Sequence, residues 1–312
     1  MNYYSQAIQI FNEVKKQVVG KDEALKLVLS AMIAGGHVLI DDIPGVGKTT
    51  MATAFAKASG LKFNRMQFTP DVLPSDISGF TMPNPEKKGM IFQRGAIFCN
   101  LFLADEINRT SPKTQSALLE VMEEYQVTVD GRTFPLERPF IVLATENPTG
   151  SSGTMKLPES EMDRFMIGIS LGYPSEKEEV EILKRKEFPE EVQKVCDPEN
   201  LLAMQKEQNS IYIHDAVYDY IVRLVKATRE QKYLELGASP RASLSLSAMG
   251  RAYAYIAGRD YVLPEDIAKV YLPVVSHRVI ESREARIDGV SSESVLMEIL
   301  KNTPRPAERK TR

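Results

Sequence analysis

The sequence predicts an α/β domain with a parallel sheet, followed by a smaller all-α domain. The runs 97–104 and 140–144 are almost continuously apolar, which is typical of strands that are buried on both faces. From residue 176 onward the apolar residues follow helical spacing, and strand signals are absent from the sequence. A chain of 312 residues is also long for one hydrophobic core, which favours two domains.

Two helices are expected before the first strand. The apolar residues of 6–18 share one helical face, and 23–34 is a second helical segment that Gly35-Gly36 closes. The connector Val19-Gly20 between them could contact a nucleotide base, or it could be a plain turn, and the sequence leaves both open. The first strand begins at His37.

The segment 41–50 has the features of a phosphate-binding loop. It follows the apolar run 37–40 and precedes the helical segment 51–57, and it contains Gly-Lys-Thr at the start of that helix. Asp42 stands where the general pattern has its first glycine, and a carboxylate beside a triphosphate is unfavourable unless it points away. A glycine turn before an ordinary helix is the alternative interpretation of this segment.

Each residue type in this loop has a physical role in phosphate binding. Gly45 and Gly47 let successive backbone N–H groups turn toward phosphate oxygens, and the helix adds its positive N-terminal end. Lys48 can reach the β- and γ-phosphates, and the Thr49 hydroxyl can bind Mg²⁺. The residues predicted to bind nucleotide are Val19, Gly20, Pro44, Gly45, Val46, Gly47, Lys48, Thr49 and Thr50.

The next segments predict a strand and a hairpin. Residues 61–68 alternate roughly between apolar and polar side chains, and 69–79 is rich in turn formers. The piece 80–98 has proline, asparagine and glycine between short apolar runs, so we expect a hairpin excursion inside a longer unit.

Two adjacent carboxylates, Asp105 and Glu106, end the apolar run 97–104. Ligands bind at the carboxyl ends of strands in open α/β sheets. Asp105 can hold Mg²⁺ through its water shell, and Glu106, which points to the other side, can polarise the attacking water. A solvated acidic turn is the alternative, and the phosphate-binding loop upstream argues against it.

A helix, a hairpin and two strands complete the α/β domain. Ser111-Pro112 begins a helix that runs to Glu124, and Asp130-Gly131 is the two-residue signal of a hairpin. The strand 140–144 leads to Asn147, which could orient a water or the γ-phosphate, although Asn-Pro is also ordinary turn chemistry. The last strand is expected at 166–171.

The domain boundary is expected at Tyr173-Pro174, because a capping box follows it at Ser175. The predicted domains are 1–173, 174–300 and a short basic tail, 301–312, that we expect to be disordered. The helices expected in the second domain are 176–187, 198–207, 214–231, 240–258 and 264–276.

Ser239-Pro240-Arg241 places an arginine in the first turn of a helix. The helix dipole disfavours a cation there, so Arg241 could serve an anion. An exposed surface arginine is the alternative, and this argument leaves both open.

Composition excludes several classes of protein. A net charge of −3 argues against sequence-independent binding to nucleic acid through the bulk field, and it leaves a local basic patch open. The sequence has no stretch of 18 apolar residues that could span a membrane. Cys99 and Cys196 have no pairing pattern, which indicates a reducing compartment, and the first residues lack a signal peptide. We therefore expect a cytoplasmic protein. The three histidines show no metal-ligand spacing.

Taken together, the motifs resemble those of the MoxR-type AAA+ ATPases. They follow that family's order over residues 18–172, and Ser239-Pro240-Arg241 extends the match. An acidic residue at position 42 is common in the family, whereas Glu146 stands where glutamine is more usual. The segments that carry the resemblance are 42–49, 67–77, 103–109, 144–148 and 162–165.

The resemblance implies an αβα P-loop NTPase sandwich with strand order 5-1-4-3-2, followed by a small all-α lid. The excursion 80–98 would be the insert in helix 2, and the hairpin at Asp130-Gly131 would precede the first sensor. Both inserts would face the pore of a ring. The catalytic residues would be Glu106, Asn147 as first sensor, Arg241 as second sensor and Arg164 as arginine finger, and the metal residues Thr49 and Asp105.

The resemblance also implies ATP and Mg²⁺ as cofactors and a homo-oligomer, a hexameric ring. The family is associated with the chaperone-like maturation of protein complexes, often with partners that carry a von Willebrand factor A domain. ATP is favoured over GTP because the guanine-reading Asn/Thr-Lys-x-Asp motif is absent from the sequence.

We therefore expect an Mg²⁺-dependent ATPase whose ring remodels a protein client. One alternative is a nucleic-acid motor or a chelatase-like AAA+ subunit, against which the acidic charge and the lack of an appended DNA-binding motif argue. The other is an ATP switch that does not hydrolyse, against which Glu106 and Arg164 argue.

Overall fold

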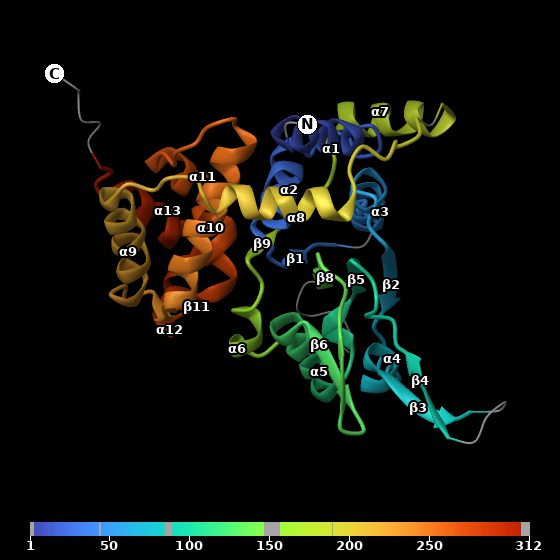
Figure 1. The fold of residues 1–312 in the computed structure, drawn as a ribbon. Helices are drawn as coiled ribbons and strands as arrows, with labels where there is room; N and C mark the ends of the chain where they lie inside the picture. Colours follow the sequence, from blue (N-terminus) through green and yellow to red (C-terminus); the bar gives the residue numbers. More distant parts are fainter. Residues whose placement is uncertain (1–2, 44, 85–88, 147–156, 189, 307–312) are drawn as a thin grey trace.

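The structure is a computed structural model that describes residues 3–43, 45–84, 89–146, 157–188 and 190–306, and only the backbone of residues 159 and 160. Figure 1 shows a central sheet with helices around it, a helical part on one side and a narrow arm on the other. None of the described helices has the length and apolarity that a membrane span requires.

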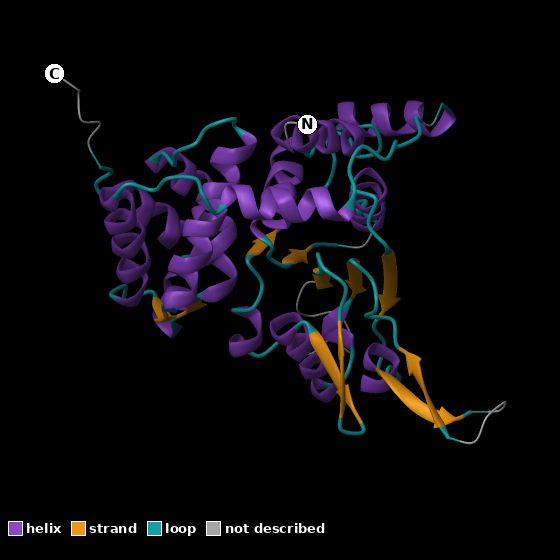
Figure 2. Ribbon diagram, in the orientation of Figure 1, coloured by secondary structure: helices purple, strands orange, loops and turns teal. Residues whose placement is uncertain are grey.

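A five-stranded parallel sheet lies at the centre of the α/β part (Figure 2). Its strand order is β2-β5-β8-β1-β9, and every neighbouring pair is parallel. Counted by position in the chain, this order is 5-1-4-3-2, which confirms the prediction. The strands are β1 (Val38–Asp41), β2 (Phe63–Gln67), β5 (Leu101–Asp105), β8 (Ile141–Glu146) and β9 (Ile167–Ile169).

Helices cover both faces of the sheet, because the central strands are apolar on both faces. In β5, Leu101 and Leu103 belong to one buried cluster, whereas Phe102 and Ala104 belong to the cluster on the other face. The helices of the first cluster include α1 (Tyr3–Lys15), α2 (Asp22–Ala34) and α3 (Lys48–Ala58), and those of the second are α4 (Pro74–Ser78) and α5 (Pro112–Glu124).

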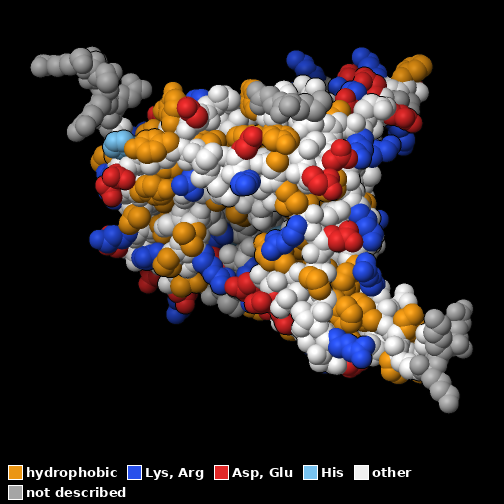
Figure 3. All heavy atoms as spheres, viewed as in Figure 1, with side chains coloured by type: hydrophobic (Ala, Val, Ile, Leu, Met, Phe, Trp, Pro, Cys, Tyr) orange, Lys and Arg blue, Asp and Glu red, His pale blue; other side chains and the backbone are white. Residues whose placement is uncertain are grey.

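Two antiparallel hairpins form the arm. The first pairs β3 (Gly79–Pro83) with β4 (Met90–Arg94), and the second pairs β6 (Gln126–Val129) with β7 (Arg132–Pro135). Both predicted hairpins are thus confirmed, and Asp130 and Gly131 have the positive φ values, 49° and 73°, that a two-residue turn requires. Phe92 stacks on Phe134 with ring centroids 3.9 Å apart, which joins the two hairpins. Figure 3 shows hydrophobic side chains on the arm.

The second part of the chain is helical, as predicted, with additions that the sequence analysis missed. A two-stranded antiparallel sheet of β10 (Leu234–Leu236) and β11 (Ile280–Glu281) interrupts the helices, so this part is not purely α. Two C-terminal helices, α12 and α13, were also missed. The helices are α7 (Glu176–Glu187), α8 (Pro198–Gln208), α9 (Asp215–Arg229), α10 (Pro240–Ile256), α11 (Pro264–Val275), α12 (Arg283–Asp288) and α13 (Ser292–Asn302).

The two parts share one hydrophobic core. Helix α10 packs on α2, and α8 packs on both α1 and α2 (Figure 1). The buried cluster on this face of the sheet therefore continues into the helical part. The boundary at Tyr173-Pro174 stays a prediction. Helix α13 ends at Asn302, two residues inside the predicted tail, and residues 307–312 lie outside the described part.

Short helices connect these elements near the site. They are η1 (Ile107–Arg109) directly after the two carboxylates, α6 (Glu159–Met162) before β9, and η2 (Ser276–Arg278) after α11.

Candidate functional site

The predicted phosphate-binding loop lies between the carboxyl end of β1 and the start of α3. Gly45 and Gly47 have φ values of 90° and 94°, a conformation that side chains other than glycine rarely adopt. No described atom lies within 4 Å of where a Cβ would stand on either glycine. A Cβ on either glycine would therefore meet no steric obstacle, and the positive φ values are what favours glycine at these positions. Pro44, predicted to bind nucleotide, lies outside the described residues.

Lys48 begins α3 and is buried, with 7% of its surface exposed. Its Nζ donates a hydrogen bond of 2.7 Å to the backbone carbonyl of Asp42. Burial lowers the pKa of Lys48, and the carboxylates of Asp105, Asp42, Glu106 and Asp41 oppose that shift. The lysine is thus placed in a negative environment at the mouth of the loop.

The carboxylate of Asp42 turns away from the loop, as a phosphate site requires. Its Oδ2 accepts hydrogen bonds from the backbone N–H of Leu171 at 2.5 Å and of Gly172 at 2.9 Å. Its Oδ1 accepts from the N–H of Ile43 at 3.0 Å. Asp42, which replaces the glycine of the general motif, therefore places no unpaired negative charge in the loop.

Asp105 stands at the carboxyl end of β5, as predicted. Its Oδ1 accepts a hydrogen bond of 2.7 Å from Thr145 Oγ1, which comes from the neighbouring strand β8. Its Oδ2 lies 2.7 Å from Arg65 Nη2, which comes from β2 on the other side. Residues from both neighbouring strands therefore fix the orientation of this carboxylate.

Glu106 follows with a left-handed backbone, φ 58° and ψ 48°, so that its side chain departs from the direction of Asp105. Its backbone N–H donates to Thr145 Oγ1 at 2.9 Å. Its Oε2 accepts from Arg109 Nη1 at 2.8 Å and from Gln67 Nε2 at 3.4 Å. In this structure the predicted catalytic carboxylate is thus held by an arginine.

The partners of the two carboxylates were missed by the sequence analysis. Arg109 follows Glu106 by three residues and could have been considered as a local partner. Arg65 and Thr145 are 40 residues away from Asp105, and only the strand order brings them to it.

The other predicted nucleotide residues lie around the start of α3 and the connector before α2. Thr49 and Thr50 line a cavity of about 540 Å³. Val19 is half-buried, and Gly20 has φ 71°. A Cβ on Gly20 would overlap the side chain of Glu178, so the connector lies directly against the first turn of α7. Asn147 lies outside the described residues.

Arg164 and Arg241 meet at one carboxylate, that of Glu123 near the end of α5. Glu123 Oε2 lies 3.1 Å from Arg164 Nε, and Oε1 lies 2.8 Å from Arg241 Nη2. The two arginines come from segments 77 positions apart in the chain (241 − 164), and Glu123 itself was not predicted. The arginine cluster, defined here as these three side chains, also lines a cavity of about 330 Å³.

The arginine cluster lies where the parallel strands of the sheet begin, which we call the amino edge; the carboxyl edge is where these strands end. Its cavity is also lined by His37, which precedes β1, and by Met166, which precedes β9. His37 Nδ1 accepts from the N–H of Val142 at the start of β8, and Nε2 donates to the carbonyl of Met122, beside Glu123. The phosphate-binding loop and Asp105 stand at the carboxyl ends of the same sheet. The structure therefore brings the predicted site residues together as two groups on opposite edges.

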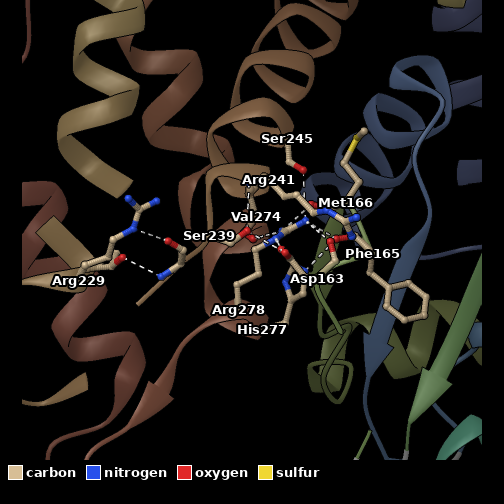
Figure 4. A network of polar contacts seen from close by, with 12 residues as sticks. Asp163, Phe165, Met166, Arg229, Ser239, Arg241, Ser245, Val274, His277 and Arg278 are labelled. Carbon is tan, nitrogen blue, oxygen red and sulfur yellow. Dashed lines mark hydrogen bonds and ion pairs between the residues drawn. The ribbon is translucent and has the colours of Figure 1, made fainter. Parts of the chain in front are cut away.

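Asp163, which precedes Arg164, is bound to Ser239 and Arg278 of the helical part (Figure 4). Its Oδ1 lies 2.8 Å from Nε of Arg278, a guanidinium that is almost fully buried, and its Oδ2 accepts from Ser239 Oγ at 2.8 Å. Arg278 also donates to the carbonyls of Phe165 and Met166 at 2.6 Å and 3.2 Å. The segment that carries Arg164 is thus fixed to the start of α10, which carries Arg241, and to η2.

Comparisons with known families match both parts of the chain. Residues 37–167 match the model of the "ATPase family associated with various cellular activities (AAA)", and residues 226–299 match the model of the "AAA lid domain". A crystal structure of a putative ATPase from Cytophaga hutchinsonii has a TM-score of 0.91 and 38% identity, over 98% of this chain and 96% of that chain.

Curated relatives extend over nearly the whole chain. The uncharacterized protein YeaC of Bacillus subtilis is 44% identical over 95% of this chain and 93% of its own length. The chaperone MoxR1 of Mycobacterium tuberculosis is 40% identical over 94% of this chain and 81% of its own. The protein MoxR of Methylorubrum extorquens is 30% identical over 90% of this chain and 91% of its own. With the AAA sheet, the phosphate-binding loop and the lid in place, the chain belongs to the MoxR family of AAA+ ATPases.

Proposed function

We propose that this protein is an Mg²⁺-dependent ATPase whose active site is completed by a second copy, and that it uses hydrolysis to remodel a protein client in the cytoplasm. The observation that carries the proposal is the separation of the predicted site residues onto two edges of the sheet. Strand β1 lies between them with four residues, roughly 13 Å at about 3.3 Å per residue.

The carboxyl edge suits the binding of ATP. The backbone N–H groups of the loop around Gly45 and Gly47 can donate to phosphate oxygens, and Lys48 adds a cation at the start of α3. Hard oxygen ligands are what Mg²⁺ prefers, and Thr49 and Asp105 would hold it together with phosphate oxygens and water. Such an ion neutralises charge on the transferred phosphoryl group when it is bound.

Glu106 is the general base in this proposal, because it leaves the strand on the other side from Asp105. Its Oε2 accepts from Arg109, and a carboxylate has acceptor positions beyond this bond that can take the proton of the attacking water. Asn147 would position that water, as the resemblance implies, although it lies outside the described residues.

The amino edge offers two cations that cannot serve the nucleotide of their own chain. Arg164 and Arg241 share Glu123 at the far end of β1 from Lys48, too far for an arginine side chain to bridge. In a head-to-tail ring, each copy presents its amino edge to the carboxyl edge of the next. Both arginines would then act on the γ-phosphate of the neighbour, with Glu123 holding them until the phosphate replaces it. We propose a hexamer, as in the family resemblance.

ATP hydrolysis measured against protein concentration tests this proposal, with sedimentation velocity on the same samples. We expect the turnover per chain to rise as rings form, to stop when Mg²⁺ is chelated, and to be absent in Lys48→Ala. The same turnover per chain from a protein that sediments as a monomer at every concentration would contradict the shared site.

One relative is named a chaperone, which supports a protein as the client. A partner with a von Willebrand factor A domain is what the resemblance suggests. Glu106→Gln protein loaded with ATP should retain such a partner from lysate, and Lys48→Ala should not. Recovery of nucleic acid instead, lost on nuclease treatment, would favour a nucleic-acid motor.

A further inference from the structure

Asp42 is the residue of the phosphate-binding loop whose type the proposed nucleotide chemistry does not explain. The general motif has glycine there, yet this chain buries a carboxylate with only 6% of its residue surface exposed. A buried carboxylate is costly unless hydrogen bonds satisfy it. Here three backbone N–H groups do so, those of Ile43, Leu171 and Gly172.

These three donors come from two places that are far apart in the sequence. Ile43 belongs to the loop itself, whereas Leu171 and Gly172 are about 130 residues away, just after β9. Gly172 has φ 61°, and α7 begins four residues later at Glu176. One carboxylate therefore joins the phosphate-binding loop to the segment where the chain leaves the sheet for the helical part.

The same segment leads back to the arginine cluster. Leu171 follows β9 (Ile167–Ile169) by two residues, Met166 directly precedes this strand, and Arg164 lies two residues before Met166. On the loop side, Lys48 Nζ donates to the carbonyl of Asp42. Asp42 thus contacts, through its backbone, the lysine expected to bind phosphate and, through its side chain, the junction with the lid.

We propose that Asp42 is a positioning residue that couples the phosphate-binding loop to the lid junction at Leu171 and Gly172. The proposal rests on the proposed ATP binding. When phosphates draw Lys48 from the carbonyl of Asp42, the loop shifts, and the carboxylate carries that shift to residues 171 and 172. Hydrogen bonds from N–H groups to a carboxylate are stronger than those to a neutral oxygen, which suits a link that has to transmit displacement.

Two substitutions of Asp42 distinguish the loss of its hydrogen bonds to Leu171 and Gly172 from the loss of nucleotide binding. Asp42→Gly restores the general motif and removes all three side-chain hydrogen bonds, so the coupling should be lost at analogue concentrations that saturate this variant. Asp42→Asn keeps one oxygen that can accept from both Leu171 and Gly172, and should retain most of the coupling. Asp76→Asn is the matched control, because Asp76 also accepts a backbone N–H, that of Leu73 at 2.9 Å, at the start of α4 rather than between the loop and the lid.

The readout is the distance between the α/β part and the lid, measured by spin-label spectroscopy. Labels at Lys113→Cys on α5 and Lys226→Cys on α9 use two exposed positions. The native thiols should not compete for label, because both are buried and burial raises the pKa of Cys99 to about 12 and of Cys196 to about 11.

We expect a non-hydrolysable ATP analogue to shift this distance in the unsubstituted protein, in Asp42→Asn and in Asp76→Asn, and to leave it unchanged in Asp42→Gly although the analogue is bound. A full shift in Asp42→Gly, or no shift in the unsubstituted protein despite bound analogue, would overturn the coupling while leaving the ATPase proposal intact. An unsubstituted protein that binds no ATP would instead overturn the proposed function.

Discussion

The two edges of the central sheet are built in different ways. At the carboxyl edge, the predicted residues come from two short stretches, 42–50 and 105–106, and each stretch directly follows a buried strand. At the amino edge, Arg164, Glu123 and Arg241 come from three segments of the chain and meet only through ion pairs.

In the proposed ring, this difference corresponds to two half-sites in each copy. The carboxyl edge has the glycine-bearing loop and the carboxylates that we propose for nucleotide and Mg²⁺, and the two described arginines that reach these carboxylates are paired with them: Arg65 with Asp105 and Arg109 with Glu106. The amino edge has two arginines that share the carboxylate of Glu123, and Arg164 also lines a cavity with Glu120, Glu124 and Glu161.

The largest effect on ATP turnover is expected from a substitution at the amino edge. Arg164→Ala should lower turnover by about 10³–10⁵-fold, because an arginine supplied to the phosphoryl group neutralises charge in the transition state. Nucleotide affinity measured with a fluorescent analogue should change little, since Arg164 is remote from the loop of its own chain. Arg223→Ala on α9, an exposed arginine far from both edges, is the control. A large loss of nucleotide affinity in Arg164→Ala, measured where the protein is monomeric, would show that Arg164 acts on the nucleotide bound by the same copy.

The second largest effect on ATP turnover is expected from a substitution at the carboxyl edge. Glu106→Gln removes the proposed general base, which contributes about 10²–10⁴-fold in rate, while it keeps the size of the side chain. ATP should still bind and should accumulate unhydrolysed in a single-turnover measurement. Normal turnover in this variant would remove Glu106 from the proposed mechanism.

A third prediction concerns the stability of the amino edge. Asp163→Ala leaves the buried Arg278 guanidinium without its carboxylate, which should lower the free energy of unfolding by about 3–5 kcal/mol. Urea unfolding measures the change. Glu230→Ala breaks the exposed pair with Lys226 on α9 and should cost less than about 1 kcal/mol. Equal costs for the two variants would show that the Asp163–Arg278 pair does not fix the amino edge.

The smallest expected effect is a dependence on pH that originates at the amino edge. Burial lowers the pKa of His37 from 6.5 to about 4, so the unfolded chain takes up this proton before the folded chain does. Stability should therefore fall as the pH drops from about 6.5 toward 4, by roughly 2 kcal/mol at pH 5 from this histidine alone.

His277 adds a shift of the same sign, because burial lowers its pKa to about 3. Urea unfolding at pH 7 and pH 5 measures the total, and His37→Gln should flatten part of the dependence. An unchanged dependence in that variant would show that His37 is not its source.

Sequence patterns predicted the carboxyl edge better than the amino edge, and the reason is physical. A phosphate-binding loop and a buried strand with terminal carboxylates are local patterns, so Lys48 and Asp105 could be placed from their neighbours. The parallel strands could be expected from their apolar runs, although the strand order came from the resemblance. The orientation of the Asp42 side chain could not be predicted from the sequence, because two of its hydrogen-bond donors lie about 130 residues away.

The parts that were missed depend on contacts between distant segments or on weak local signals. Glu123 on α5 has no feature that distinguishes it from the acidic residues beside it, and only the fold brings Arg164 and Arg241 to it. The strands β10 and β11 have three and two residues, too few for an alternating pattern, and α12 has six, less than two turns.

Mixing two inactive variants tests the central claim most directly. Lys48→Ala loses the nucleotide half-site and keeps the arginines, whereas Arg164→Ala loses an arginine and keeps the nucleotide half-site. If a complete site needs both edges from different copies, mixed rings contain interfaces in which both halves are intact. We expect ATP hydrolysis to return in the mixture to a measurable fraction of the activity of the unsubstituted protein. Mixed rings, verified by two-colour labelling, that stay as inactive as either variant alone would contradict the account.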